Sequence, residues 1–193
     1  MNFTQTLQIS DCNDIPRIEF FKILCKGKKV LHIGCVDWPF VPEHNLHIAL
    51  QDCTELCDGY DLNSDRYGML EKYIKEGNEL WVDLPYSEDT LYDFVLIPEV
   101  LEHVTNLEYF FENMNTINTK QYVITVPCAV QCGRRGHFAY DKDSEVFTEE
   151  VHPEHLAWYT PYTLKNAIQT YTDWKINSLF WLNEISVGVT CTK

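Results

Sequence analysis

Short apolar runs that alternate with segments of helical spacing constrain the fold of this chain more than any other feature of its sequence. The clearest runs cover residues 30–33, 94–97 and 121–127. Continuous apolar character over so few residues is typical of strands buried on both faces, as in a parallel sheet. Strands that alternate with helices predict a doubly wound, Rossmann-like α/β fold, in which ligands bind at the carboxyl ends of the strands.

Weaker signals predict the remaining strands and the layers that cover the sheet. We expect strands over 46–50 and 79–84, a strand that ends at Tyr60, and helices over 15–26, 67–77 and 105–117. Thr160 should cap a further helix that has Pro161 in its first position, where proline is well tolerated. The β-rich runs on either side of Asn183-Glu184 predict a C-terminal antiparallel hairpin.

Composition limits the partners and surroundings of the protein. A length of 193 residues favours a single domain that spans the whole chain, 1–193. The net charge of −14 repels phosphate backbones, so a small-molecule partner is favoured over nucleic acid. The chain lacks an apolar run long enough to cross a membrane, and its start lacks the features of a secretory signal. We therefore expect a cytoplasmic protein whose eight cysteines are free thiols.

Four residues follow Ile33, Tyr60, Val82 and Ile97, at the expected ligand-binding edge of such a sheet. They are Gly34, Asp61, Asp83 and Pro98. Gly34 would let the backbone pass close to a bound group, because a side chain would clash there. A carboxylate at Asp61 could accept two hydrogen bonds from ribose hydroxyls, and Asp83 could accept one from an amino group such as that of adenine. The order of these residues predicts a site for an adenosine-containing cofactor.

Five stretches of the chain, taken in order, resemble the motifs of the class I S-adenosylmethionine-dependent methyltransferases, in particular the small-molecule, UbiG-like members. The stretches are "KKVLHIGC", "DGYDLN", "WVDL", "YDFVLIPEVLEHVTN" and "HPEHLAWYTPYTLKNAI". The resemblance covers residues 20–193. It implies a mainly parallel, seven-stranded sheet whose seventh strand is reversed, which agrees with the predicted C-terminal hairpin.

The resemblance also implies an activity and a set of binding residues. The activity would be methyl transfer from S-adenosyl-L-methionine to an oxygen or nitrogen of a small molecule or sugar. Methyl transfer depends mainly on positioning a nucleophile against the sulfonium, so the sequence does not name the acceptor. The residues that would bind the cofactor are Gly34, Cys35, Asp37, Asp61, Leu62, Asp83, Leu84 and Pro98.

The first motif departs from the family pattern at three positions. His32 stands where an acidic residue is usual, and Val36 and Trp38 replace the second and third glycines. In one interpretation, the loop binds the cofactor with a single glycine, and Trp38 packs over the methionine tail or plugs the core. In the other, the cofactor site has decayed, and the chain is a catalytically inactive binding module with a methyltransferase fold.

Glu99, Glu102 and His103 would share one face of a helix that follows the preceding strand. Together with His155, and with His152 nearby, they could bind Mg²⁺ or Mn²⁺. This spacing resembles that of the metal-dependent 2′-O-methyltransferases of RNA ends. In the alternative, the glutamates only stabilise the start of the helix, as in related enzymes that share "EVLEHV" and use no metal.

Without a metal, a histidine is the natural general base for removing the acceptor proton. The ordinary pKa of histidine lies near neutrality, so the neutral ring can take a proton from a hydroxyl group during methyl transfer. His103 and His155 are the candidate catalytic residues, and His137 is an alternative.

Residues 128–159 show no clear periodicity, and they leave the sheet at its ligand-binding edge. We expect them to form an acceptor-side insertion or lid, and Gly133 and Gly136 would let this segment move. The polar and aromatic residues that could grip a small acceptor are His137, Tyr140, His152, His155, Trp158 and Tyr159.

Overall fold

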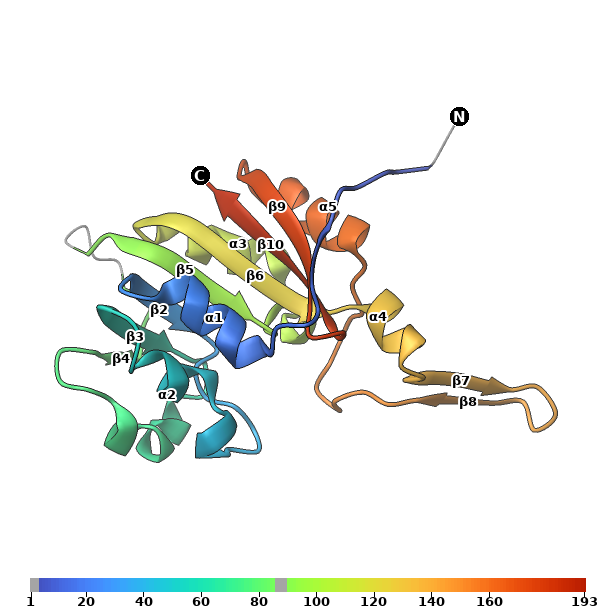
Figure 1. Cartoon of the computed structure of the whole chain (residues 1–193), viewed down its shortest axis with the longest axis horizontal. Helices are drawn as coiled ribbons and strands as arrows, with labels where there is room; N and C mark the ends of the chain where they lie inside the picture. The colour runs from blue at the N-terminus through green and yellow to red at the C-terminus, as the bar shows by residue number, and fades with distance from the viewer. Residues whose placement is uncertain (1–3, 86–89) are drawn as a thin grey trace.

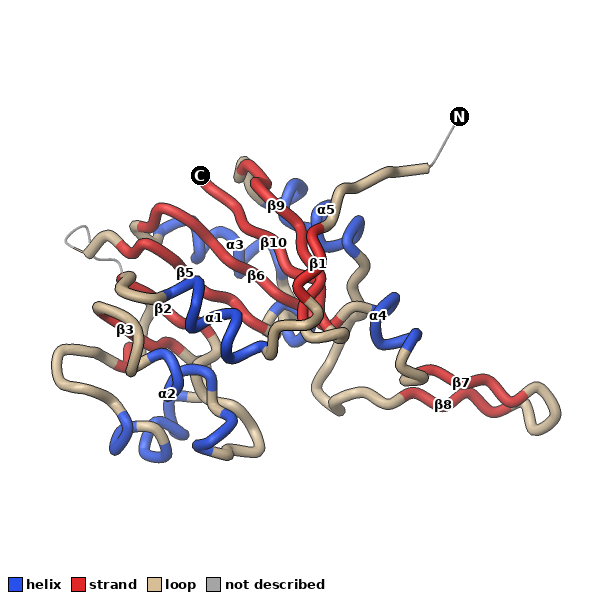
Figure 2. Tube along the Cα trace, in the orientation of Figure 1, coloured by secondary structure: helices blue, strands red, loops and turns tan. Residues whose placement is uncertain are grey.

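One large sheet forms the centre of the molecule, in a computed structural model that describes residues 4–85 and 90–193. Its strands are β1 (Ser10–Cys12), β2 (Lys29–Ile33), β3 (Leu56–Tyr60), β4 (Leu80–Trp81), β5 (Tyr92–Pro98), β6 (Thr119–Pro127), β9 (Lys175–Leu182) and β10 (Ser186–Thr192). They lie in the order β1-β9-β10-β6-β5-β2-β3-β4 (Figure 1, Figure 2). A separate hairpin, β7 (Phe138–Asp141) and β8 (Val146–Glu149), projects from the body of the molecule (Figure 1).

The strand directions confirm the predicted Rossmann-like sheet. The strands β4, β3, β2, β5 and β6 are parallel, and β10 runs antiparallel to both β6 and β9. The seven strands from β4 to β9 therefore form the expected sheet with its reversed C-terminal strand. Strand order reverses between β2 and β5, and such a switch point opens a crevice at the carboxyl ends of the strands.

An eighth strand, β1, was not predicted. It pairs in parallel with the edge strand β9, with Ser10 opposite Phe180 and Cys12 opposite Leu182. Three residues with a polar centre carry no strand pattern, so the pairing depends on the open edge that β9 presents. The first three residues of the N-terminal segment lie outside the described residues.

Helices cover both faces of the sheet (Figure 1). On one face lie α1 (Arg17–Cys25) and α2 (Leu46–Leu50), and on the other lie α3 (Leu107–Thr116) and α5 (Pro161–Tyr171). Phe21 and Leu50 are buried on the first face, and Phe111 and Leu164 are buried on the second. Burying each such side chain contributes about 1.5–3 kcal/mol to folding. No helix in the described residues is long and apolar enough to span a membrane. A further short helix, α4 (Ala129–Arg134), follows β6.

The C-terminal part of the chain follows its sequence pattern. The Thr160 hydroxyl accepts a hydrogen bond from the Thr163 N–H at 3.2 Å, and the Thr160 N–H donates to the Thr163 hydroxyl at 2.8 Å. With Pro161 as the first helical residue, this capping box fixes the start of α5. The β9–β10 turn has positive φ angles of 53° at Asn183 and 56° at Glu184. The predicted helix cap and terminal hairpin are both confirmed.

Residues 46–50 form helix α2, so the strand expected there is wrong. The Asn45 side chain accepts a hydrogen bond from the Ile48 N–H at 2.9 Å and caps the helix. Leu46 and Leu50 are buried one helical turn apart. Five residues are too few to distinguish a short buried helix from a strand by periodicity.

The prediction of a helix over 67–77 is also wrong. Of the strand predicted over 79–84, only the two residues of β4 form a strand. Two 3-10 helices, η2 (Ser64–Met69) and η3 (Glu71–Tyr73), replace the expected helix. The Tyr67 hydroxyl accepts a hydrogen bond from the Asp61 N–H and donates one to the Trp81 carbonyl, both at 2.7 Å. These contacts tie the segment to the ends of two strands, and tertiary contacts of this kind override helix propensity.

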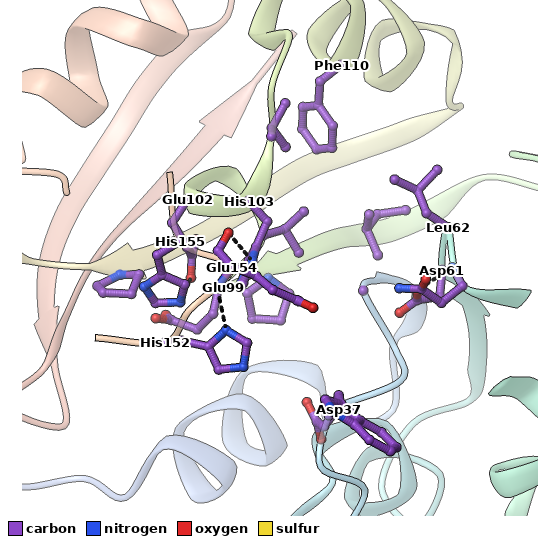
Figure 3. Close-up of a pocket in the computed structure, with 18 of the residues that line it drawn as sticks. Asp37, Asp61, Leu62, Glu99, Glu102, His103, Phe110, His152, Glu154 and His155 are labelled. Atoms are coloured by element: carbon purple, nitrogen blue, oxygen red, sulfur yellow. Dashed lines mark hydrogen bonds and ion pairs between the residues drawn. The ribbon is translucent and has the colours of Figure 1, made fainter. Parts of the chain in front are cut away.

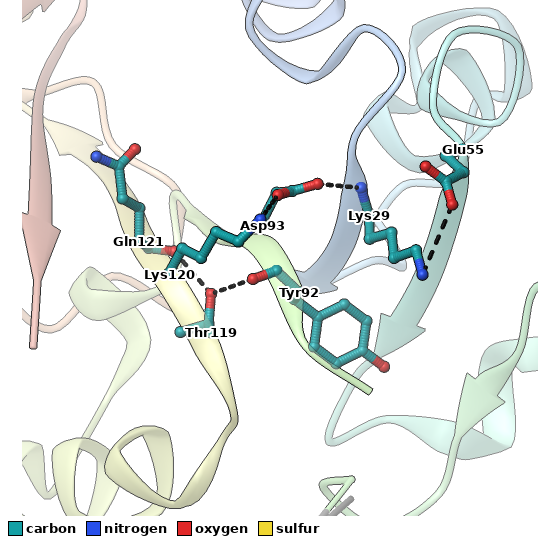
Figure 4. Close-up of polar contacts among 7 residues, drawn as sticks. All are labelled: Lys29, Glu55, Tyr92, Asp93, Thr119, Lys120 and Gln121. Atoms are coloured by element: carbon teal, nitrogen blue, oxygen red, sulfur yellow. Dashed lines mark hydrogen bonds and ion pairs between the residues drawn. The ribbon is translucent and has the colours of Figure 1, made fainter. Parts of the chain in front are cut away.

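At the amino ends of the central strands, polar contacts fix the register of β2, β5 and β6 (Figure 4). Asp93 accepts a hydrogen bond from the Lys29 N–H at 3.0 Å and forms an ion pair with Lys120 at 2.5 Å. The Thr119 hydroxyl donates to the Tyr92 carbonyl at 3.3 Å. The hydrogen bond from Lys120 lowers the pKa of Asp93. These contacts are structural, because they lie at the end of the sheet opposite the switch-point crevice.

Candidate active site

A cavity of about 1020 Å³ opens at the carboxyl ends of β2, β3 and β5, where the strand order reverses. Its wall includes the last residues of these strands and the loops that follow them. The structure brings together seven of the eight residues that were expected to bind a cofactor: Gly34, Asp37, Asp61, Leu62, Asp83, Leu84 and Pro98.

Two residues of the first motif face away from this cavity. Cys35 is fully buried in a small cluster with Val36, Tyr67 and Leu70, and burial raises the pKa of its thiol. Cys35, which was expected to bind a cofactor, is therefore not part of the cavity lining. His32 is buried within β2, where neither ring nitrogen has a hydrogen-bond partner. Burial lowers the pKa of His32 well below its ordinary value, so this position supplies a neutral ring in place of an acid.

Gly34 makes the turn after β2 possible. Its φ of 75° lies in the left-handed region, and a Cβ atom there would lie 2.7 Å from Cγ2 of Val100. The Gly34 N–H donates to the Tyr60 carbonyl at 2.8 Å, which holds the turn against the end of β3. The loop thus needs glycine at this position for both its conformation and its packing.

Asp61 directly follows β3 and lines the cavity. Its Oδ2 atom accepts a hydrogen bond from the Val36 N–H at 3.0 Å, and its Oδ1 atom accepts one from the Asn63 N–H at 2.8 Å. Each carboxylate oxygen can accept more than one hydrogen bond, so both retain capacity for a ligand. The two backbone donors orient the carboxylate and join the loops after β2 and β3.

Trp38 lies on the rim of the cavity and does not plug the core. Its side chain is 55% exposed, and the guanidinium of Arg66 lies 4.6 Å from the centre of its ring. Asp37 beside it accepts a hydrogen bond from the Asn45 side chain at 2.8 Å. Burial raises the pKa of Asp37, while the charge of Arg17 opposes this shift.

Glu99, Glu102 and His103 lie beside the cavity, but they do not share one face of an α-helix. Glu99 follows β5 with a positive φ of 55°, and only a single 3-10 turn, η4 (Leu101–His103), follows it. The left-handed residue breaks the helical path that was expected there. The Leu156 N–H donates to the Glu102 carbonyl at 2.7 Å and brings the segment 152–155 against this turn.

This packing assembles an acid–imidazole cluster on the side of the cavity away from Asp61 (Figure 3). His103, His152 and His155 bring one ring nitrogen each within 4.8 Å of one another. The Nε2 atom of His155 lies 3.9 Å from Oε1 of Glu102. Neither oxygen of Glu102 has a hydrogen-bond partner, and neither does Nδ1 of His155. Such a donor set, with unsatisfied buried atoms, fits a divalent cation.

The protonation of the cluster follows from its burial. Burial, together with the charge of Glu99, raises the pKa of Glu102 well above its ordinary value. Burial and the neighbouring histidines lower the pKa of His155 to about 4. The pKa of His103 is also lowered, chiefly by burial. At neutral pH these two imidazoles are uncharged and can therefore accept a proton or bind a metal.

The segment 128–159 contributes part of the cavity wall. His137, His152, His155 and Trp158 line the cavity, as expected, whereas Tyr140 and Tyr159 do not. The segment contains α4 and the β7–β8 hairpin, and it carries Tyr140 out on the exposed part of this hairpin (Figure 1). Tyr159 is buried and donates to the Leu101 carbonyl at 3.3 Å.

The described lining is strongly acidic. Its carboxylates are Asp37, Asp61, Asp83, Glu99, Glu102, Glu150 and Glu154, and its cationic residues are Arg17 and Arg66. Sequence reasoning missed both arginines, Glu150 and Glu154. Arg17 could have been found, because a helix that leads into a parallel strand begins near the carboxyl end of that strand.

Comparisons with known proteins point to the fold. No protein-family model and no curated protein matches the chain. Among solved structures, a chain of the Pnkp1/Rnl/Hen1 RNA repair complex has a TM-score of 0.59 and 16% identity, and the match covers 92% of this chain and 41% of that one. The magnesium protoporphyrin IX methyltransferase ChlM from Synechocystis PCC 6803, with bound SAH, has a TM-score of 0.58 and 12% identity, with 87% and 75% covered.

The N-methyltransferase NodS from Bradyrhizobium japonicum WM9 has a TM-score of 0.55 and 12% identity, and the match covers 92% of each chain. Identities this low establish the fold alone. The chain has the fold of the class I S-adenosylmethionine-dependent methyltransferases.

Proposed function

We propose that the protein transfers a methyl group from S-adenosyl-L-methionine to a hydroxyl or amino group of a small molecule. The observation that carries this proposal is a single cavity that joins the Gly34 turn and Asp61 to a group of neutral imidazoles. Two structural neighbours, NodS and ChlM, are named as methyltransferases, and the ChlM structure has bound SAH, which supports the proposal. Asp61 would accept hydrogen bonds from the ribose, and Asp83 would lie toward the adenine.

The imidazoles suit the removal of a proton from the acceptor. S-adenosylmethionine would supply an electrophilic methyl group on its sulfonium sulfur. As the acceptor oxygen or nitrogen forms its bond to this methyl carbon, the carbon–sulfur bond breaks and leaves a neutral thioether. His155 or His103 would take the acceptor proton. Because lowered pKa values keep both rings neutral, neither must first lose a proton.

The acidic lining bears on the acceptor class. Seven carboxylates and two arginines surround the cavity, so a phosphate-rich acceptor would be repelled in the absence of a bound cation. A neutral or cationic acceptor fits this environment. The rings of Trp158 and Phe110 also line the cavity and offer apolar contact.

Two measurements test this proposal. Calorimetric titration with S-adenosylhomocysteine tests the cofactor site, and transfer of a labelled methyl group to a panel of phenols, sugars and amines tests the reaction. His155→Ala should lower kcat by about 10²-fold and leave S-adenosylhomocysteine affinity unchanged. The control is His44→Ala, because His44 is exposed and lies outside the cavity lining. Binding without transfer to any acceptor would favour the catalytically inactive binding module, and absence of binding would refute the proposal.

The acid–imidazole cluster favours a second candidate, metal-dependent 2′-O-methylation of RNA ends. The three clustered histidines would offer nitrogen donors to Mg²⁺ or Mn²⁺, and Glu102, 3.9 Å from His155, would add an oxygen donor. A bound divalent cation would offset the negative lining and could bind the hydroxyl oxygens of a terminal ribose. The chain also resembles a protein of an RNA repair complex in fold.

Short RNA substrates distinguish the two candidates. The RNA candidate predicts methyl transfer to an oligoribonucleotide with Mn²⁺ and no transfer to a matched oligonucleotide that ends in a 2′-deoxynucleotide. Loss of the reaction on adding a chelator, and its return with Mn²⁺, would support the metal role. Transfer to a small acceptor at full rate in chelator would support the metal-free reaction instead.

A further inference from the structure

The β7–β8 hairpin turns an aromatic face to the solvent. Tyr140 and Phe147 are opposite each other in the two strands, so their side chains share one face of the hairpin. The two residues are 63% and 58% exposed. Among the described residues, β7 and β8 pair only with each other. Because an isolated two-stranded hairpin is only marginally stable in water, large exposed rings on it indicate a binding surface.

Ring contacts join this face to the histidine cluster in the cavity. Phe138, two residues before Tyr140 on the same face, stacks on Phe147 with ring centres 6.4 Å apart. The ring of Phe138 also makes an edge contact with Trp158, with centres 4.9 Å apart. The ring of Trp158 in turn lies 6.4 Å from that of His155. The rings of Trp158, Phe138, Phe147 and Tyr140 therefore form an aromatic track that leads from the cavity onto the hairpin.

Polar contacts hold the base of the hairpin beside the cavity. The indole N–H of Trp158 donates to the carboxylate of Glu149. The Glu150 N–H donates to the His137 carbonyl at 2.9 Å. Trp158, His137 and Glu150 all line the cavity. The aromatic track thus begins at a fixed point on the cavity wall.

The charge around the aromatic track is negative, like that of the cavity lining. Residues 138–150 contain one lysine, Lys142, and five carboxylates, all of them exposed: Asp141, Asp143, Glu145, Glu149 and Glu150. An apolar surface surrounded by carboxylates favours a ligand that is both apolar and cationic. A ligand of this kind that reached the histidine cluster would meet the same acidic surroundings along its whole length.

We propose that the methyl acceptor is a cationic amphiphile, a primary amine on an extended apolar chain, whose amine enters the cavity while its chain lies along the aromatic track. The inference rests on the proposed function and names its acceptor class. In the transfer, the ammonium group loses one proton to His155 or His103, and the electron pair that this frees forms the bond to the methyl carbon. The carbon–sulfur bond breaks, and its electron pair stays on sulfur.

Calorimetry with three probes, in the absence of cofactor, tests the aromatic track. Butylamine and dodecylamine differ only in chain length, and dodecanoate joins a long chain to an anionic head. Dodecylamine should bind at least about tenfold more tightly than butylamine, because each methylene group buried strengthens binding by up to about fourfold. Dodecanoate should bind at least about tenfold more weakly than dodecylamine, because the carboxylates repel its head.

Substitutions on the two faces of the hairpin separate the aromatic track from the rest of the surface. Phe147→Ser should weaken dodecylamine binding by about 5- to 20-fold and leave butylamine binding within about twofold. The matched control is Val146→Ser, at the adjacent residue, which is 51% exposed on the opposite face. It should leave both affinities within about twofold. Phe147→Leu, which keeps an apolar side chain on the hairpin, should lose less affinity than Phe147→Ser.

Equal losses of dodecylamine affinity in Phe147→Ser and Val146→Ser, or in Phe147→Ser and Phe147→Leu, would overturn the role of the aromatic track. So would equal affinities of the unmodified protein for butylamine and dodecylamine. If the protein binds S-adenosylhomocysteine but transfers no labelled methyl group from S-adenosylmethionine to dodecylamine, the acceptor class is wrong. Absence of S-adenosylhomocysteine binding would instead refute the proposed function, whatever the result with the amines.

Discussion

The Nε2 atom of His155 lies 3.9 Å from Oε1 of Glu102, a fully buried carboxylate with no hydrogen-bond partner. A buried charged carboxylate is costly unless a proton or a cation neutralises it. The raised pKa of Glu102 favours neutralisation by a proton. The adjacent imidazoles could instead hold a cation beside it. Whether a proton or a cation neutralises Glu102 therefore distinguishes a metal-free from a metal-dependent reaction.

Manganese binding directly tests whether a cation neutralises Glu102. If the cluster holds a metal, Mn²⁺ titration followed by electron paramagnetic resonance should show one bound ion. Glu102→Gln, which keeps the shape of the side chain but removes its charge, should weaken Mn²⁺ binding by at least about tenfold. His137→Ala is the control, because His137 lines the same cavity outside the cluster. Equal affinity in Glu102→Gln and the unmodified protein would remove Glu102 from the proposed metal site.

Asp61→Asn should weaken binding of S-adenosylhomocysteine. The substitution replaces one acceptor oxygen with a donor, which then faces either a backbone N–H or a ribose hydroxyl. We expect a loss of about 1–3 kcal/mol in binding free energy, measured by calorimetry. Asp65→Asn provides the control, since Asp65 is exposed and does not line the cavity. Unchanged affinity in Asp61→Asn would show that another residue holds the ribose.

Gly34→Ala should destabilise the protein more than the same change at Gly136. Both glycines have positive φ angles, of 75° and 82°, so alanine is strained at each by about 1–2 kcal/mol. Only at Gly34 does a Cβ also meet a neighbour, Val100, and this overpacking adds about 1–3 kcal/mol. Urea denaturation measures both free energies of unfolding. Equal losses would show that the loop moves away from Val100 without cost.

Stability should fall in mildly acidic solution because of His47. Burial lowers its pKa from 6.5 to about 4, so the unfolded chain binds more protons between these values. The stabilising contribution is complete above about pH 6.5 and is lost as pH falls toward about 4. The shift corresponds to about 3 kcal/mol.

Urea denaturation over this pH range measures the effect. His47→Gln should show a shallower fall in the free energy of unfolding, with a residual slope from His32, whose pKa is also lowered. His44→Gln, at an exposed site, should follow the unmodified protein. If His47→Gln retains the full pH dependence, another group controls acid stability.

Ligands should protect the segment 128–159 from proteolysis if it acts as a lid. Its base supplies His152 and His155 to the cavity, while its β7–β8 hairpin extends away from the body (Figure 1). We expect S-adenosylhomocysteine, together with an acceptor, to slow cleavage between Gly133 and Glu150 several-fold. Cleavage at the same rate in every state would identify the segment as a fixed insertion.

The sequence by itself determined the central strands of the sheet. The apolar runs 30–33, 94–97 and 121–127 correspond to β2, β5 and β6, because strands buried on both faces must be apolar along their whole length. Gly34 and Asp61 could be placed at strand ends for the same reason. The C-terminal hairpin and the capped helix α5 could also be predicted from the sequence, since caps and turns depend on residues close together in the chain.

Tertiary structure alone decided how distant segments meet. Glu102 and His155 come together because the chain after α4 returns across η4, and no local pattern records this contact. The conversion of residues 46–50 into a helix and the recruitment of β1 by β9 likewise depend on the packing of remote partners. Local periodicity reports which face of an element is buried, whereas the contacts between elements are set by packing in three dimensions.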